Sequence, residues 1–299
     1  MSLPRLAVTL GDPRGIGPEI VAAARAHPDV RAAASLVLVG PDGTRVPVDH
    51  AVGRWDAARD DAAAAGRLAG RAIEAATAMV QRGEADAIVT APIDKAALLA
   101  GGYDFPGHTE MLGALTGARP VMMLASDRLR VVLATTHIAL RDVPDAVTAE
   151  AIMEVAASTR AHLVAWFGIA EPRIALCALN PHAGDGGRFG AEDDSILAPA
   201  ARAAGLLGPF PADTVFVRAL RGAFDAVIAP YHDVGMTAIK VASFGHAVNV
   251  TLGLPFPRTS PDHGTALDIA GRGLADPSSM IAATLLAARL AAVARPVGA

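Results

Sequence analysis

Histidine follows three apolar runs of this sequence, at the point where each run ends. His137 closes VVLATTH, His182 follows LCALNP, and His232 follows FDAVIAPY. Such runs are typical of buried strands, and the carboxyl ends of parallel strands lie along one edge of a sheet. Neutral imidazole is the commonest side-chain ligand for divalent metals. The repeated placement predicts a metal site formed by these histidines, although each one alone is also compatible with a hydrogen-bonded loop residue.

A second set of polar residues interrupts strand-like segments near the C-terminus. Lys240, Asn249 and Arg258 offer an ammonium group, an amide and a guanidinium group, which together suit an anionic polyol. Asp213 and Asp233 are candidate carboxylates for proton transfer, although aspartate in a surface turn is the ordinary alternative.

The segment FPGHTEML predicts a helix that begins close to His108 and Thr109. These side chains and the free backbone amides of a helix N-terminus could bind an anion. A capping threonine next to an incidental histidine explains the same residues.

The first glycine-rich segment, GDPRGIGPEI, follows a predicted strand at residues 5–10 and opens a helix. Gly11, Gly15 and Gly17 would allow a nucleotide to approach the backbone closely. The spacing is neither GxGxxG nor a Walker A loop. A simple tight turn is therefore equally compatible with these residues.

Strands and helices alternate along the chain, which predicts an α/β fold. The exception is a predicted antiparallel hairpin at residues 119–126 and 129–137, which suggests a lobe boundary near residues 117–119. The other principal predictions are strands at residues 35–40, 85–90 and 173–179, and helices at residues 57–81 and 149–167.

Composition limits the class of protein. The chain has 299 residues, 52% of them hydrophobic and 4% aromatic, and a formal net charge of −4. This length allows two lobes, and the mild acidity argues against a nucleic-acid surface. The single cysteine, Cys177, excludes a disulfide within the chain. It is typical of a protein in a reducing compartment, so we expect a cytoplasmic protein. The apolar C-terminal run contains Arg289 and Arg295, so we expect an amphipathic helix there.

Over nearly its whole length the sequence resembles the 4-hydroxythreonine-4-phosphate dehydrogenase family of pyridoxal phosphate biosynthesis. The segment DHGTALDIAGRGLADP also resembles the nucleotide-binding loop of the wider isocitrate and isopropylmalate dehydrogenase superfamily. The matching blocks are GDPRGIGPEI, TAPIDK, PGHTE, ATTHIALRDVPDA, LNPHAG, PADT, APYHD and VNVTLGLPFPRTSPDHGTALDIAGRG.

This resemblance implies a two-lobed α/β/α homodimer with the active site at the subunit interface. The nucleotide-binding lobe is expected at residues 1–117 and 246–299, and the metal, substrate and dimerisation lobe at residues 118–245. The cofactors implied are NAD or NADP and a divalent metal, which could be Zn, Mg, Co or Mn.

The resemblance also implies roles for individual residues. The expected metal ligands are His137, His182 and His232, with one ligand coming from the partner subunit. The expected substrate-binding residues are His108, Thr109, Lys240, Asn249 and Arg258. The catalytic candidates are Lys240, Asp233 and Asp213. The cofactor-binding candidates are Gly11, Asp12, Gly15, His263, Gly264, Thr265 and Asp268.

The implied reaction is oxidation of the hydroxyl of 4-hydroxythreonine 4-phosphate, followed by decarboxylation to 3-amino-2-oxopropyl phosphate. The metal would make the hydroxyl more acidic, and Lys240 or Asp233 would take its proton. Two departures from the family pattern leave the substrate open: Val234 replaces the usual glutamine, and the connection at residues 41–56 is short. The alternatives are a 4-phosphoerythronate or related hydroxy-acid dehydrogenase, an inactive ligand-binding homologue, and a metal-dependent hydrolase. The retained PGHTE block argues against an aromatic dihydrodiol as substrate.

Overall fold

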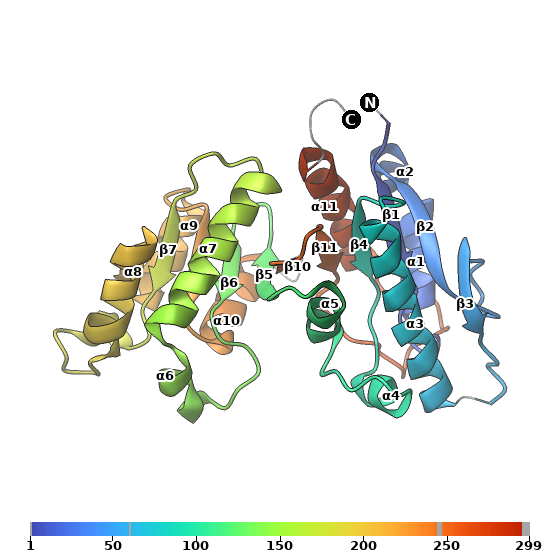
Figure 1. The fold of residues 1–299 in the computed structure, drawn as a ribbon, viewed down its shortest axis with the longest axis horizontal. Coiled ribbons are helices and arrows are strands. Elements are labelled where there is room, and N and C mark those ends of the chain that lie inside the picture. The colour runs from blue at the N-terminus through green and yellow to red at the C-terminus, as the bar shows by residue number, and fades with distance from the viewer. Residues whose placement is uncertain (1, 60, 244–246, 295–299) are drawn as a thin grey trace. The chain divides into compact units, whose positions relative to one another are not determined.

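The chain forms two compact units, which are shown in Figure 1. The computed structural model describes residues 2–59, 61–243 and 247–294. Unit 1 consists of Met1–Pro120 and Val248–Ala299, and unit 2 consists of Val121–Ala247. Each unit combines a sheet with helices, which confirms the predicted α/β class. Among the described residues, no helix is long and apolar enough to cross a membrane.

The sheet of unit 1 has the strand order β3-β2-β1-β4-β11-β10. Neighbouring strands run parallel except for β10 and β11, which are antiparallel. The strands are β1 (Arg5–Thr9), β2 (Ser35–Asp42), β3 (His50–Arg54), β4 (Ala87–Thr90), β10 (Val248–Leu252) and β11 (Arg258–Ser260).

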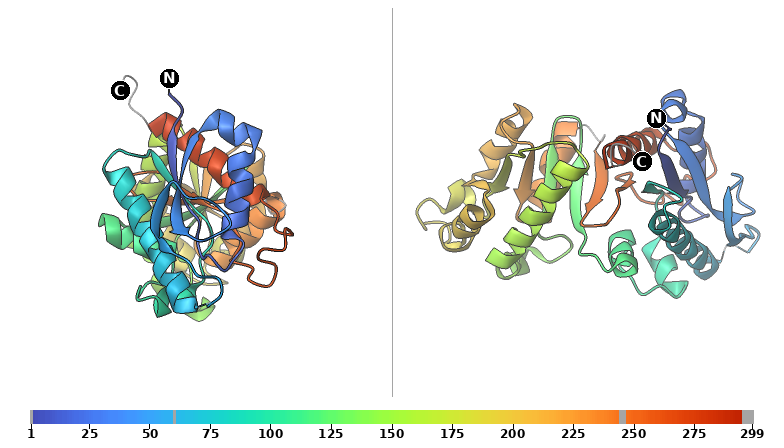
Figure 2. Two further views of the ribbon diagram at one scale, coloured as in Figure 1. Left: turned by 90° about the vertical axis from the view of Figure 1, so that its right-hand side faces the viewer. Right: turned by 45° about the horizontal axis from the view of Figure 1, so that its top comes forward.

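Helices cover both faces of this sheet, which is seen from two further directions in Figure 2. One face packs against α3 (Ala62–Gln81) and α5 (His108–Thr116), and the other against α11 (Ser278–Ala294). Apolar side chains on both faces explain why β1 and β4 are almost continuously hydrophobic. The remaining helices of unit 1 are α1 (Gly17–Ala26), α2 (Pro28–Ala33) and α4 (Lys95–Ala100).

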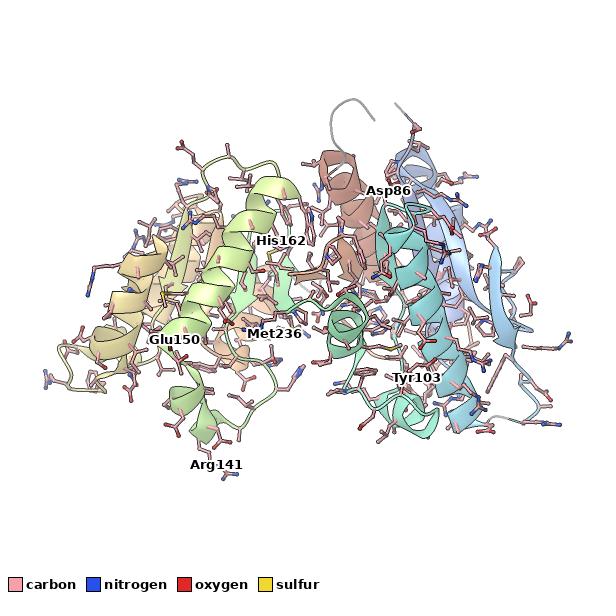
Figure 3. All side chains as sticks on the ribbon, viewed as in Figure 1. Asp86, Tyr103, Arg141, Glu150, His162 and Met236 are labelled. Carbon is pink, nitrogen blue, oxygen red and sulfur yellow. The ribbon has the colours of Figure 1, made fainter. Side chains whose placement is uncertain are left out.

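The start of α3 differs from the predicted start near residue 57. The carboxylate of Asp61 accepts hydrogen bonds from the backbone amides of Ala63 and Ala64, so the helix begins after this cap. Further along, the hydroxyl of Tyr103 donates to Glu74 at 2.9 Å and ties the loop after α4 to α3; Tyr103 is labelled in Figure 3.

The sheet of unit 2 has the strand order β5-β6-β9-β7-β8. As predicted, the first two strands form an antiparallel hairpin, and the remaining neighbours are parallel. The strands are β5 (Val121–Ala125), β6 (Arg130–Leu133), β7 (Ile174–Cys177), β8 (Leu207–Phe210) and β9 (Ala226–Ala229).

Helices also pack around the sheet of unit 2. The face that includes Val131, Ala175 and Val227 forms a core with α9 and α10. Met236 of α10, labelled in Figure 3, packs against this core. The α-helices of unit 2 are α6 (Val143–Ala146), α7 (Ala149–Ala165), α8 (Ala198–Ala204), α9 (Ala212–Leu220) and α10 (His232–Ser243).

Candidate active site

The three histidines that follow apolar runs do follow neighbouring parallel strands of unit 2. Strand β9 lies between β6 and β7 and pairs in parallel with both. His137 comes after β6, His182 after β7 and His232 after β9. All three histidines therefore follow strands that end at the same carboxyl edge of one sheet, as the sequence predicts.

Two of these histidines lie close together. The ring centres of His137 and His232 are 5.6 Å apart, with 47° between the ring planes. Two imidazoles bound to one tetrahedral cation at about 2.1 Å place their ring centres roughly 5 Å apart. The observed separation thus fits two ligands of a single metal ion.

The orientation of His232 is set by the residue that follows it. Nδ1 of His232 lies 2.8 Å from Oδ1 of Asp233. If Nδ1 carries the proton and donates to the carboxylate, Nε2 keeps the lone pair that a metal requires. A carboxylate bonded to the second nitrogen is the usual partner of a metal-binding histidine. This contact supports an orienting role for Asp233.

His182 lies apart from the other two rings in this chain. It is exposed, and its ring centre lies 6.3 Å from that of Phe189 in the following glycine-rich loop. Among the residues that the structure describes, no group of three His, Cys, Asp or Glu side chains could hold a metal ion. A three-histidine site therefore stays a prediction, and it would need His182 from a second copy of the chain.

In unit 1, Arg258 is a charged residue that is buried inside the fold. It is 2% exposed, and its guanidinium donates to the hydroxyls of Thr90 at 2.6 Å and Thr251 at 2.9 Å. No described carboxylate forms an ion pair with it. Burial lowers the pKa of Arg258 to about 10, which the more distant Glu110 partly opposes. A buried cation without a counter-ion is costly and favours an anionic ligand.

Strand register brings further polar groups to the same face of the sheet. Thr251 of β10 bonds to Arg258 of β11, and Asn249 lies two residues before Thr251, opposite Ser260. The side-chain oxygen of Asn249 and Nε of Arg258 are buried without a hydrogen-bond partner. These atoms retain unused hydrogen-bonding capacity for a ligand.

His108 is the first residue of α5, which covers this face. Its Nε2 atom is buried and also lacks a partner. Burial, and to a smaller extent the nearby Arg258 cation, hold the pKa of His108 well below its usual value. The ring is therefore neutral at physiological pH. Thr109 follows in the first turn of the helix, where backbone amides remain free to bind an anion.

The depressed pKa of His108 should make stability depend on pH. In the unfolded chain its pKa is about 6.5, so below this pH the unfolded state binds more protons than the folded state. The unfolding free energy should fall by at most about 1.4 kcal/mol per pH unit as the pH drops below that value. Urea unfolding of wild type and His108→Asn between neutral pH and pH 5 measures this contribution. Parallel pH profiles for the two proteins would contradict it.

The predicted cofactor-binding residues form two loops that meet in unit 1. The backbone amide of Ile16 donates to the carbonyl of Thr265 at 3.0 Å, and a Cβ on Gly15 would lie 2.8 Å from that oxygen. Gly11 has a φ of +71°, and a Cβ there would lie 2.2 Å from the carbonyl oxygen of Pro92. Close packing of the protein itself thus explains both glycines.

Near these loops, one carboxylate is buried in an ion pair, and several other candidate residues are exposed to solvent. Asp12 is fully buried and pairs with Arg14 at 2.7 Å. His263, Gly264 and Asp268 are exposed. The loops offer backbone groups and side chains to a ligand, but cofactor binding by these residues stays a prediction.

The remaining candidates lie on helices of unit 2. Lys240 is exposed in the last turn of α10, the helix that begins with His232. Asp213 is exposed in the first turn of α9, and no contact among the described residues joins it to the histidines.

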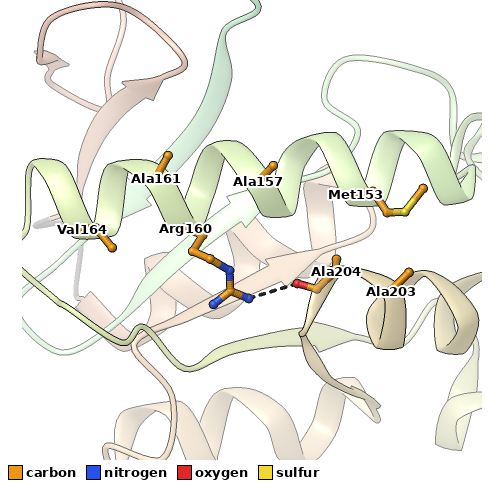
Figure 4. A pocket seen from close by; sticks show the side chains of 7 residues that line it. All are labelled: Met153, Ala157, Arg160, Ala161, Val164, Ala203 and Ala204. Carbon is orange, nitrogen blue, oxygen red and sulfur yellow. Dashed lines mark hydrogen bonds between the residues drawn. The ribbon is translucent and has the colours of Figure 1, made fainter.

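A groove in unit 2, drawn in Figure 4, contains none of the predicted site residues. It is lined by α7 and α8, and Arg160 donates to the carbonyls of Ala204 and Gly205 at the end of α8. We assign Arg160 a structural role, because its guanidinium satisfies carbonyls that the helix leaves open.

Comparison with known proteins identifies the family. A family model described as "Pyridoxal phosphate biosynthetic protein PdxA" matches residues 23–287. The chain belongs to this family. A PdxA relative from Roseobacter denitrificans, named 4-hydroxythreonine-4-phosphate dehydrogenase, is 49% identical over 95% of this chain and 87% of its own length. The enzyme of that name from Geobacter metallireducens is 44% identical over 97% and 96% of the two chains.

Solved structures agree with the PdxA assignment. A 4-hydroxythreonine-4-phosphate dehydrogenase from Klebsiella pneumoniae superposes with a TM-score of 0.86 at 39% identity, covering 97% of this chain and 98% of the other. A terephthalate 1,2-cis-dihydrodiol dehydrogenase from Burkholderia xenovorans reaches 0.67 at 29% identity over 96% and 98%. A β-decarboxylating dehydrogenase from Thermococcus kodakarensis shares the fold alone, with a TM-score of 0.50 and 15% identity over 96% and 82%. The predicted family and fold class are confirmed.

Sequence reasoning missed the two threonines that bond to Arg258. Thr90 and Thr251 end or interrupt buried strands, where threonine is an ordinary β-branched residue. The hydrogen bonds in the folded chain show that both hydroxyls face the guanidinium.

Proposed function

We propose that this chain is a 4-hydroxythreonine-4-phosphate dehydrogenase that uses NAD or NADP and a divalent metal. It oxidises the substrate hydroxyl, and the product decarboxylates to 3-amino-2-oxopropyl phosphate. Membership of the PdxA family supports this assignment. The observation that carries it is the buried guanidinium of Arg258, which has no carboxylate partner and suits the phosphate of such a substrate.

In this proposal the phosphate binds in unit 1. Arg258 supplies charge and two-pronged hydrogen bonding, and the start of α5 at His108 and Thr109 supplies further donors. Neutral His108 can donate from one ring nitrogen without a second buried cation. Asn249, whose side-chain oxygen lacks a partner, would bind a hydroxyl or amine of the substrate.

The metal ligands would be His137 and His232 of one subunit and His182 of the partner subunit in a homodimer. The close pair of rings and the exposed third ring support this division. Zn, Mg, Co and Mn are the candidate ions. When bound, the cation would supply Lewis-acid polarisation of the substrate hydroxyl.

Proton transfer would fall to Lys240. Asp233 bonds to His232, which favours an orienting role over that of general base. Lys240 lies on the helix that begins at His232, so one rigid element would carry both a metal ligand and the proton acceptor. The loops around Gly15 and Thr265 would bind the dinucleotide that accepts the hydride.

The proposed reaction predicts metal-dependent reduction of the cofactor. With 4-hydroxythreonine 4-phosphate, the absorbance of reduced nicotinamide should rise with NAD or NADP. Removing the metal should lower the rate at least about a hundredfold, and adding one of the four candidate ions should restore it. The His182→Ala variant, tested in parallel, should not recover. Full turnover after exhaustive metal removal would contradict the mechanism.

The same assay separates the alternatives. Val234 packs partly buried against the core of unit 2, where the family commonly has a polar glutamine. This difference motivates 4-phosphoerythronate and related phosphorylated hydroxy acids as a second substrate set. A higher kcat/KM with one of them would reassign the substrate. Calorimetric binding without any hydride transfer would instead identify an inactive homologue.

A further inference from the structure

Asp193 is a buried carboxylate that accepts hydrogen bonds from one short stretch of backbone. It is 0% exposed and lies at the start of a π-helical turn, Asp193–Leu197. Its two oxygens accept the backbone amides of Leu179 at 2.8 Å and Asn180 at 2.9 Å. An ionised carboxylate is costly to bury, and these charge-assisted bonds offset that cost.

The two amides belong to the residues between the end of β7 and His182. Immediately after them the backbone takes an unusual course, because His182 and Ala183 have φ angles of 54° and 56°. The left-handed region costs a residue with a side chain roughly 1–2 kcal/mol. Two such residues in succession persist only when the surroundings hold them in place.

A second contact holds the same stretch from the side. Nδ2 of Asn180 donates to Oε2 of Glu192 at 2.8 Å, directly beside Asp193 in the sequence. A Cβ on Gly190 would lie 2.5 Å from that Glu192 oxygen, so glycine allows the loop to close over the contact. Asp193 thus holds the backbone that precedes His182, and Glu192 holds the side chain of Asn180.

We propose that Asp193 is a positioning residue that fixes the direction of the His182 imidazole for metal binding. The inference rests on the metal site of the proposed function. Asp193 has no described contact with the ring itself, so it acts through the backbone at Leu179 and Asn180. Without this hold the turn can relax to an ordinary right-handed conformation, and the imidazole would point elsewhere.

The test is Co²⁺ binding to the full-length protein, followed by visible absorption. Asp193→Asn keeps the size of the side chain but places an amide against one of the two N–H groups. It should weaken Co²⁺ binding about ten- to a hundredfold and change the spectrum at saturating Co²⁺. Binding of inorganic phosphate, which the proposal assigns to unit 1, should stay within twofold of wild type.

Asp225→Asn is the matched control. Asp225 accepts the backbone amide of Arg173 at 2.8 Å, just before the other end of β7. This variant also removes a carboxylate that holds the backbone near the strand, but far from His182 in the sequence. It should leave the cobalt spectrum unchanged. Equal spectral changes in the two variants would show a general loss of structure and overturn the proposal.

Further variants keep the outcomes distinct. If His182→Ala binds Co²⁺ as wild type does, the proposed metal site is wrong. If His182→Ala loses binding but Asp193→Asn matches wild type, the positioning role is wrong and the metal site stands. Should Asp193→Asn fail to fold, Glu192→Gln must give a smaller change of the same spectrum, and an unchanged spectrum overturns the inference.

Discussion

Replacing Arg258 with methionine should lower kcat/KM for the phosphorylated substrate by two to three orders of magnitude without destabilising the protein. Replacing a buried residue usually lowers both the stability and the activity of a protein. For Arg258 we expect the two to separate, because its charge is buried next to two neutral hydroxyls and no carboxylate.

The loss of activity follows from the strength of buried charge pairs. Removing one partner of such a pair costs about 2–5 kcal/mol of binding, and each 1.4 kcal/mol corresponds to a factor of ten. Stability behaves differently, because an apolar side chain of similar volume removes the desolvation cost of a buried charge. The unfolding free energy should therefore stay within about 1 kcal/mol of wild type, or rise.

Arg160→Met is the control for this prediction. Arg160 also bonds to neutral acceptors, but it is only partly buried, so its replacement removes little desolvation cost while carbonyls at the end of α8 lose their donor. It should lose about 1–3 kcal/mol of stability with little change in KM. Denaturant unfolding and steady-state kinetics of both variants decide the matter. A strongly destabilised Arg258→Met protein with unchanged KM would show that the guanidinium is structural.

The positions of the three histidines could be predicted only in part from the strand pattern of the sequence. Apolar runs that end in histidine were sufficient to predict that His137, His182 and His232 start from one sheet edge, and the parallel β6-β9-β7 order agrees. The separation of the His182 ring from the other two rings could not be predicted from the sequence. It depends on left-handed backbone and on Asp193, which bonds to the strand end from a later segment.

Short and irregular strands escaped prediction for another reason. β3 (His50–Arg54) has no buried residue, and β8 (Leu207–Phe210) contains Gly208 and Pro209. Neither has the apolar alternation or run that marks a strand, because both are flanking strands of their units and have a single partner within them.

The glycine-rich segment was ambiguous in the sequence for a physical reason. A glycine that admits a nucleotide and one that admits another loop of the protein require the same missing Cβ. In the structure, Pro92 and Thr265 occupy the space beside Gly11 and Gly15. Packing alone therefore accounts for the pattern, and nucleotide binding needs its own test.

Mixing two inactive variants should restore activity if His182 completes the metal site of the partner subunit. His137→Ala and His182→Ala homodimers should each be inactive, because every site lacks one ligand. In a heterodimer of the two, one site carries both defects and the other has a full set of histidines. Purified heterodimers with two different affinity tags should therefore show about half the activity of wild type.

The pair His137→Ala and His232→Ala provides the control. These two rings lie 5.6 Å apart in the same chain, so each subunit of that heterodimer spoils its own site and no activity should return. Three ligands from one chain would give no recovery in either mixture. Recovery in the control alone would place His137 and His232 in different sites. Only recovery confined to the His137→Ala and His182→Ala pair agrees with the close ring pair and the separate left-handed turn.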